Sequence, residues 1–189
     1  MSEPRTWGRL RSLPRSQRLA LAAGFTALGV VLSTFAIPVG PARVFPFQHL
    51  INVLAGVMLG PGYAVLTAFS ISVLRNAAGT GTFLAFPGSM FGALFVGIAY
   101  KLWRRDSAAF VEPIGTAIVG GLVGYLLIAQ ISAPAVLLGF IRANPASPQP
   151  YLGLFGGALA LVASFAVSSI PGTILGYLTL RALGRAGLR

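Results

Sequence analysis

Long apolar stretches that end in clusters of arginine restrict this chain to very few folds. The first of them, Leu19–Ile37, carries no charged residue and follows five arginines. A helix needs about 20 apolar residues to cross the hydrocarbon core of a bilayer. This stretch is longer than the apolar core of a secretory signal peptide, and no clear small-residue cleavage motif follows it. We therefore expect a retained first membrane helix.

Five more apolar stretches follow the first. The second and third are short, and Gly60-Pro61-Gly62 between them predicts a sharp turn that makes them a helical hairpin. The six predicted spans are Leu19–Ile37, Phe47–Leu59, Tyr63–Ala78, Pro87–Trp103, Pro113–Ile131 and Tyr151–Leu183. We predict an all-α polytopic membrane protein with a basic cytoplasmic segment at 1–18, a six-helix transmembrane bundle at 19–183 and a cytoplasmic tail at 184–189.

The charge distribution predicts an orientation and excludes one class of partner. With six crossings and a cytoplasmic N-terminus, 11 of the 14 lysines and arginines face the cytoplasm, and Arg43, Arg75 and Arg142 face outside. Positive residues concentrate on the cytoplasmic side of membrane proteins. We therefore predict a multi-pass protein of the cell (inner) membrane with both termini in the cytoplasm. We expect no nucleic-acid partner despite the net charge of +11, because the cations lie at the ends of apolar stretches.

Enzyme chemistry and metal binding find little support in the sequence. There is no cysteine, His49 is the single histidine, and the acids are Glu3, Asp106 and Glu112. The topology puts Asp106 and Glu112 on the cytoplasmic side, away from His49, so we expect no catalytic pair, metal or cofactor. Glu112 directly precedes Pro113, which is a common start of a helix. An ATP-binding motif is missing, so any energy must come from partners or an ion gradient.

Polar residues within the spans gather on the outer side of this topology. Such residues are costly in a membrane and are usually functional. The candidate ligand-binding residues are His49, Asn52, Arg75, Asn76, Thr80, Thr82, Phe86 and Ser89. This mixture of donors, hydroxyls and an aromatic ring suits a small, partly aromatic ligand. Simpler roles stay open: a packing histidine, an arginine that extends to the headgroups, and a flexible turn at 79–82.

Short motifs between Phe35 and Tyr100 are specific enough for comparison with a known family. In order, they are Gly40-Pro41-Ala42, Phe45-Pro46, Gln48-His49, Ile51-Asn52-Val53, Leu59-Gly60-Pro61, Ala68-Phe69, Arg75-Asn76, Gly79-Thr80-Gly81-Thr82 and the stretch 84–92. This third of the chain resembles the ThiW family of S components of energy-coupling-factor (ECF) vitamin transporters. The family is assigned to hydroxyethylthiazole, a thiamin precursor. The resemblance implies a six-helix subunit that captures this precursor from outside. It also implies a transmembrane coupling subunit and two cytoplasmic ATPases as partners.

The resemblance also implies a docking surface for the coupling subunit. The family has an Ala-x-x-x-Ala signature on its first helix, which Ala23 and Ala27 match, and Ala20 extends the same helix face. The chain departs from the family by lacking a proline near Tyr125 and by an expanded Pro-rich connector at 143–150. Two other classes stay open. One is a structural membrane protein without a ligand. The other is an ion-coupled secondary transporter, which would need an intramembrane carboxylate and inverted repeats.

Overall fold

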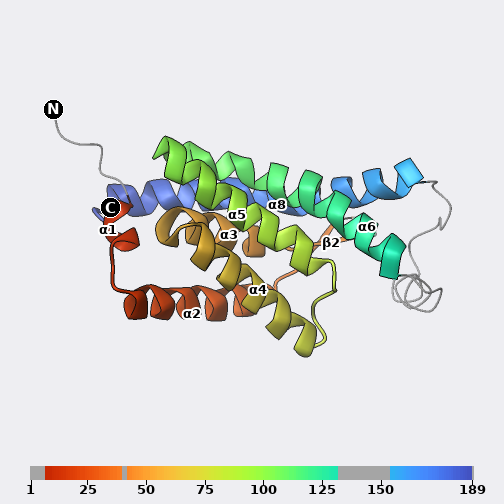
Figure 1. Ribbon diagram of the computed structural model, residues 1–189, viewed down its shortest axis with the longest axis horizontal. Coiled ribbons are helices and arrows are strands. Elements are labelled where there is room, and N and C mark those ends of the chain that lie inside the picture. Colours follow the sequence, from red (N-terminus) through yellow and green to blue (C-terminus); the bar gives the residue numbers. More distant parts are fainter. Residues whose placement is uncertain (1–6, 40–41, 132–153, 189) are drawn as a thin grey trace.

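The computed structural model describes residues 7–39, 42–131 and 154–188, and nearly all of these are helical (Figure 1). The α helices are α1 (Gly8–Arg11), α2 (Arg15–Leu32), α3 (Pro46–Leu59), α4 (Pro61–Ala77), α5 (Ala85–Trp103), α6 (Gly121–Ile131) and α8 (Leu154–Arg185). A 3₁₀ helix, η1 (Asp106–Val111), and a π helix, η2 (Ile114–Gly120), lead into α6. The all-α prediction is confirmed, with a short hairpin of β1 (Ile37–Val39) and β2 (Ala42–Val44) between α2 and α3.

The first long helix ends earlier than the sequence predicted. Helix α2 ends at Leu32, and Ile37 opens strand β1, where it pairs with Val44. The hydroxyls of Ser33 and Thr34 each donate to a carbonyl of the last turn at 2.7 Å. Such side-chain bonds compete with the continuing ladder of backbone bonds. The chain therefore leaves the helix at this point and turns back toward the start of α3.

The predicted hairpin between the second and third spans is confirmed. Gly60 separates α3 from α4 with a φ of 88°, a backbone conformation that favours glycine. Pro61 then takes the first position of α4, where an N–H would have no partner within the helix. These two residues fix where α3 stops and let α4 begin at once.

Residues 106–131 form a helical rod with an irregular middle, and the rod begins seven residues before the predicted start at Pro113. Its π helix lies close against α5. A Cβ added at Gly115 would lie 2.5 Å from the carbonyl oxygen of Phe91, and one at Gly120 would lie 2.7 Å from that of Pro87. Segments of π helix are frequent at functional sites. Here the segment brings its side chains against the interior of the bundle.

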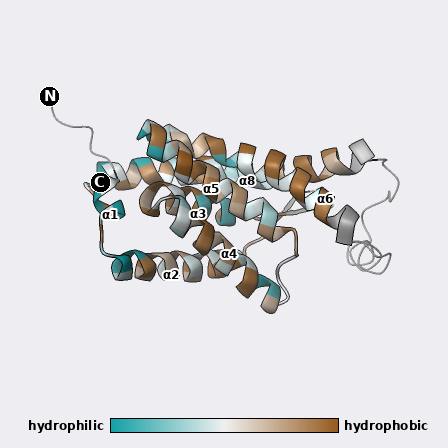
Figure 2. Ribbon diagram, viewed as in Figure 1, coloured by the Kyte–Doolittle hydropathy of each residue, from teal (hydrophilic) through white to brown (hydrophobic). Residues whose placement is uncertain are grey.

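Helix α3 is the centre of the bundle and packs against α2, α4, α5 and α8. Eleven of its 14 residues are buried, among them Gln48, His49 and Asn52. The outer surface is apolar instead: Leu102 is 72% exposed and Leu126 is 57% exposed. Figure 2 shows hydrophobic residues along the lengths of α5, α6 and α8. A polar interior beneath an apolar surface is the arrangement expected of a protein surrounded by lipid.

Three helices in the described part of the chain are long and apolar enough to cross a membrane: Ala85–Trp103, Asp106–Leu127 and Ala158–Arg185. Helix α3 is apolar but has only 14 residues. These helices support a multi-pass membrane protein, and the number of six crossings stays a prediction. The predicted connector at 143–150 and the predicted start of the last span at Tyr151 lie outside the described residues.

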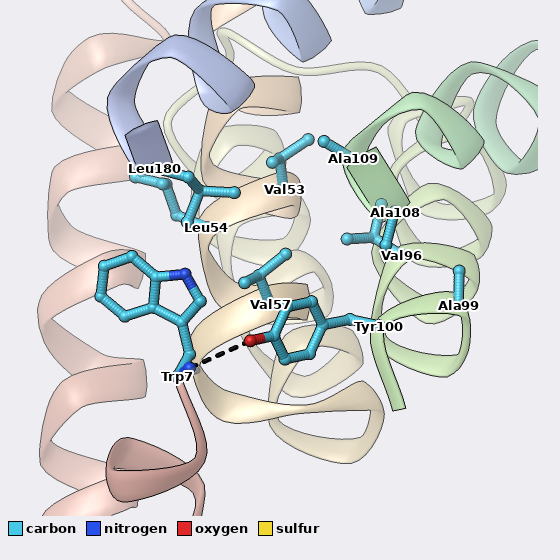
Figure 3. Close-up of a cluster of buried hydrophobic side chains, with 10 residues drawn as sticks. All are labelled: Trp7, Val53, Leu54, Val57, Val96, Ala99, Tyr100, Ala108, Ala109 and Leu180. Atoms are coloured by element: carbon cyan, nitrogen blue, oxygen red, sulfur yellow. Dashed lines mark hydrogen bonds between the residues drawn. The ribbon is translucent and has the colours of Figure 1, made fainter. Parts of the chain in front are cut away.

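Trp7 and Leu10, within the segment predicted to be basic and cytoplasmic, pack into the bundle. Trp7 is 1% exposed, and its backbone N–H donates to the hydroxyl of Tyr100 at 3.0 Å (Figure 3). Its indole N–H donates to Asp106 at 3.2 Å. The same hydrophobic cluster includes Leu180 of α8, with Leu183 packed against it. Helix α1 and the C-terminal end of α8 therefore lie at one end of the bundle, as an even number of crossings requires (Figure 1).

Candidate functional site

A carboxylate is buried in the interior of the bundle. Glu112, between η1 and η2, is fully buried and interacts with four side chains. Its Oε1 lies 2.8 Å from His49 Nδ1, 3.1 Å from Asn52 Nδ2 and 2.7 Å from Thr116 Oγ1, and its Oε2 lies 3.3 Å from Thr173 Oγ1. With the proton of His49 on Nδ1, all four groups donate to the carboxylate. They come from α3, η2 and α8, so residues far apart in the sequence surround one acid.

Asn52 extends this network to α5. Its Oδ1 accepts a hydrogen bond from Ser89 Oγ at 3.0 Å, while its amide nitrogen donates to Glu112. Gly92 of α5 leaves the space that the carboxylate occupies. A Cβ there would lie 2.5 Å from Glu112 Oε1 and still closer to the hydroxyl of Thr116. We refer to the Glu112 cluster as His49, Asn52, Ser89, Glu112, Thr116 and Thr173.

The position of Glu112 shows that one sequence prediction was wrong, namely that this acid lies on the cytoplasmic side, away from His49. The prediction assumed that the fifth helix begins at Pro113, so that Glu112 would cap its first turn. The rod begins at Asp106 instead. Since a 3₁₀ helix rises about 2.0 Å per residue, Glu112 lies about 12 Å along the rod from Asp106. At this position its carboxylate contacts the side chain of His49 on α3.

A second polar cluster surrounds Arg75 near the C-terminal end of α4. The guanidinium group donates to Gln48 Oε1 and, at 3.1 Å, to the carbonyl of Thr80, and it stacks over the ring of Phe45 at 4.5 Å from the centroid. Arg75 is 3% exposed, so the alternative of an arginine extending to the headgroups is wrong. Gln48 is adjacent to His49, and the two clusters therefore meet at the start of α3. We refer to the Arg75 cluster as Phe45, Gln48, Arg75, Asn76, Thr80 and Thr82.

The turn at 79–82 is built by hydrogen bonds to its neighbours. The amide of Thr80 donates to the carbonyl of Arg75 at 2.9 Å. The side-chain amide of Asn76 donates to the carbonyl of Thr82 at 3.1 Å. The side chains of Thr80 and Thr82 are exposed, whereas Asn76 is half-buried. The structure thus brings these residues together with Arg75, and their contact with a ligand stays a prediction.

Phe86 lies apart from both clusters. Its ring packs against Phe69 and Phe83, with centroids 5.6 and 5.7 Å apart, respectively. It lines a groove of about 270 Å³ whose lining residues are apolar and come from α4, α5, α6 and the turn before α5. Ser89, three residues later, belongs to the Glu112 cluster. The predicted set therefore divides among two polar clusters and one apolar groove.

The predicted docking residues Ala20, Ala23 and Ala27 are exposed on α2. Ala23 and Ala27 line a groove of about 550 Å³ between α2 and α4, together with apolar side chains such as Phe69 and Val73. A Cβ added at Gly24 would meet nothing within 4 Å, so the adjoining surface is also open. The alternative of a strip used for packing inside the bundle does not agree with this exposure.

The polar groups around Glu112 are arranged for hydrogen bonding. In the ranges that the structure describes, no group of three or more histidine, cysteine, aspartate or glutamate residues is placed to hold a metal ion. The neighbours of Glu112 direct hydrogen-bond donors at its carboxylate. Hydrogen bonds are strong in an interior from which water is excluded. The Glu112 cluster is therefore a candidate for recognition of a small polar molecule, and its contact with a ligand stays a prediction.

Sequence reasoning missed four residues of these clusters: Gln48, Glu112 as a central acid, Thr116 and Thr173. Gln48 stands next to His49 in a quoted motif, and Thr116 follows Glu112 by four residues, the spacing of neighbours on a helix. Both signals could have been used. Thr173 lies in a long apolar stretch after Pro171, and only the packing of α8 against α3 and η2 reveals its position.

Comparison with solved structures identifies the class of this fold. The chain superposes on a structure described as "Structure and mechanism of the S component of a bacterial ECF transporter", with a TM-score of 0.68 and 18% sequence identity. The match covers 93% of this chain and 100% of the other. The fold is therefore that of an ECF-transporter S component.

The sequence itself places the chain in a family. Residues 19–186 match the family model of ThiW, the thiamine-precursor transporter protein, and the chain belongs to this family. No curated protein sequence matches the chain. The expected class is thereby confirmed: the chain is a substrate-binding transporter component of the membrane and not an enzyme.

Proposed function

We propose that this chain captures hydroxyethylthiazole from outside the cell and delivers it to an ECF coupling subunit and two ATPases that use ATP. One observation carries the proposal: the central helix α3 presents His49 and Asn52 to a fully buried carboxylate. Buried polar groups inside a membrane bundle are expensive and mark sites of function. Hydroxyethylthiazole has a ring nitrogen that accepts and a hydroxyl that donates, and the two clusters contain groups of both kinds.

Ligand identification tests this proposal most directly. The purified protein should retain a ligand that mass spectrometry identifies as hydroxyethylthiazole, and titration should give a saturable binding curve for it. The pyrimidine half of thiamin is the matched comparison, because it is similar in size and polarity. Tighter binding of the pyrimidine would mean that the pyrimidine is the substrate, and the transporter class would still hold. Absence of binding to both would favour a structural membrane protein without a ligand.

Docking on the coupling subunit is proposed for the exposed face of Ala20, Ala23 and Ala27. A strip of small residues lets another helix approach closely, and a bulky side chain there would hold it away. Ala23→Trp and Ala27→Trp should therefore keep ligand binding but lose copurification with the coupling subunit and lose uptake. Leu28→Trp is the control, because it places the same ring on a neighbouring face of α2. Normal uptake by both alanine variants would show that this face does not dock.

The proposed orientation is open to labelling, because the chain has no cysteine. Single cysteines at Ser2, Ser107 and Gly187 should react only with reagents applied from the cytoplasmic side, and one at Ser147 only from outside. Reaction of Ser107→Cys from outside would contradict six crossings and require another arrangement of the spans.

An ion-coupled secondary transporter is the second candidate, and Glu112 is the observation that favours it. Such transporters use intramembrane carboxylates. The sequence analysis predicted none, because it placed Glu112 on the cytoplasmic side. The test is uptake by proteoliposomes that contain this chain alone. A proton or sodium gradient should drive no accumulation if the chain depends on ATPase partners, and gradient-driven accumulation would favour the second candidate.

A further inference from the structure

The two oxygens of the Glu112 carboxylate are used unequally. Oε1 interacts with His49, Asn52 and Thr116 at 2.7–3.1 Å. Among the described residues, Oε2 receives the hydroxyl of Thr173 at 3.3 Å, which is long for a bond between oxygens. A carboxylate can accept at about four lone-pair sites. Oε2 therefore has acceptor capacity that the protein leaves largely unused.

A buried hydroxyl without a partner lies next to Thr173 on α8. Ser169 is fully buried, and its Oγ has no hydrogen-bond partner among the described residues. It precedes Thr173 by four residues, so the two side chains lie on one face of the helix, one turn apart. Its neighbour Ser168 accepts from the backbone N–H of Phe45, which ties this turn to the start of α3. Such unsatisfied hydroxyls are rare in protein interiors.

The unused hydrogen-bonding capacity of Glu112 Oε2 and of Ser169 on α8 determines which ligand groups would fit. Oε2 of Glu112 can only accept while ionised, and Ser169 can donate. A ligand hydroxyl both donates and accepts, so its chemistry matches the unused capacity of both groups. An ether accepts only and would turn a lone pair toward the carboxylate. An ammonium group donates only, so it would leave the O–H of Ser169 without an acceptor.

We propose that Glu112 and Ser169 select for an alcohol group on the captured molecule. The hydroxyl donates to Oε2 of Glu112, replaces the weak bond from Thr173, and accepts from Ser169 Oγ. This inference rests on the proposed function, because hydroxyethylthiazole carries such a group. It goes further by naming the part of the ligand that is recognised and the two residues that recognise it. Other small neutral alcohols share this chemistry.

Binding of three matched thiazoles to the purified protein tests the proposal: hydroxyethylthiazole, its O-methyl ether and the ethyl analogue without oxygen. The alcohol should bind at least about tenfold more tightly than either analogue, as expected for one well-made hydrogen bond to a charged group. Glu112→Gln and Ser169→Ala should each reduce this preference to less than about threefold. Affinity for the ethyl analogue should change little in Ser169→Ala.

The ratio of the affinities separates recognition from structural support. A variant that merely loosens the bundle weakens all three ligands by the same factor, and that result would overturn the proposal. Ser169→Ala also keeps the proposal testable if Glu112→Gln fails to fold. Thr67→Val is the matched control: Thr67 Oγ1 is another buried hydroxyl without a partner in the described chain, on α4. It should leave the preference unchanged.

The failures of the two proposals are distinguishable. If wild-type protein binds the ether as tightly as the alcohol, the alcohol selection is wrong and capture of a thiazole still stands. If none of the three thiazoles binds, the proposed function fails, and this inference fails with it.

Discussion

The two ends of α3 both engage arginines and polar partners, but in different ways. At the C-terminal end, Arg11 donates to the carbonyls of Gly56 and Val57 at 2.6 and 2.9 Å, and Arg18 donates to that of Leu59 at 2.5 Å. At the N-terminal half, Gln48, His49 and Asn52 bond through their side chains to Arg75 and Glu112. One end is bound through its backbone and the other through its side chains.

The difference separates structural support from a site. Every α helix ends with carbonyls that have no partner within the helix, and cations near that end are stabilising. Arg11 and Arg18 meet this general need and also stack on Tyr100 and Tyr63 at 4.6 and 4.2 Å. Burial is the main cause that lowers the pKa of Arg11, and repulsion from neighbouring arginines lowers it further. An arginine nevertheless stays charged at neutral pH. The side-chain bonds at the N-terminal half of α3, by contrast, depend on which residues are present. Ligand recognition is therefore expected at this half of the helix.

The largest effect is expected from Glu112→Ala. The substitution leaves the donors of His49, Asn52 and Thr116 without an acceptor in the buried interior. A buried donor left without a partner costs about 1–3 kcal/mol of stability. We expect a clear fall in thermal stability in detergent and loss of detectable ligand binding by calorimetry. Asp106→Ala, which removes the acid at the start of the rod, should lower stability through Trp7 and preserve the ligand Kd.

Gly92→Ala should disturb the same end of α3 without removing any polar group. The new methyl group would collide with the Glu112 carboxylate and the Thr116 hydroxyl. Overpacking of this kind costs typically 1–3 kcal/mol, and we expect ligand binding to weaken more than about tenfold. Gly24→Ala on α2 is the matched control, because a Cβ there meets nothing within 4 Å. Equal melting temperatures and equal affinities for the two variants would contradict the observed packing of η2 against α5.

The sequence predicted the backbone arrangement better than the site. The Gly60-Pro61 turn was predicted because local residues determine it, and the long apolar stretches ending in arginine indicated the membrane helices. The end of α2 was placed at Ile37 because apolar residues continue past Leu32, whereas the hydroxyls of Ser33 and Thr34 end the helix.

The pairing of Glu112 with His49 could not be read from local sequence. They are 63 residues apart, and their contact depends on the 3₁₀ start of the rod and on close packing of glycines against α5. Residue type predicted His49, Asn52 and Ser89 as a group, because polar side chains in apolar helices are expensive. Residue type alone could not reveal which acid they share.

Asn52→Ala is expected to have an intermediate effect. The substitution removes a bond to Glu112 at 3.1 Å and a bond from Ser89 at 3.0 Å, while the carboxylate keeps three other donors. The neutral bond from Ser89 contributes about 0.5–1.5 kcal/mol, and the bond to the carboxylate contributes more. Ligand binding should weaken about tenfold with expression intact. Unchanged affinity in well-folded Asn52→Ala and Arg75→Ala proteins would favour a structural protein without a ligand.

The smallest effect is expected at the opposite end of α3, from Arg11→Lys. Lysine keeps the positive charge near the last carbonyls but lacks the planar fork that bonds to Gly56 and Val57 together and stacks on Tyr100. A hydrogen bond from a charged group contributes about 1.5–3 kcal/mol, and the ammonium group can replace one of the two. We expect the melting temperature to fall slightly and the ligand Kd to stay within about twofold of wild type. Arg11→Ala should lower the melting temperature further with the same Kd, because the side chain at position 11 then donates to neither carbonyl. A tenfold weaker Kd in Arg11→Lys would mean that capping of α3 controls its side-chain partners, and the division between a supporting end and a binding end would be wrong.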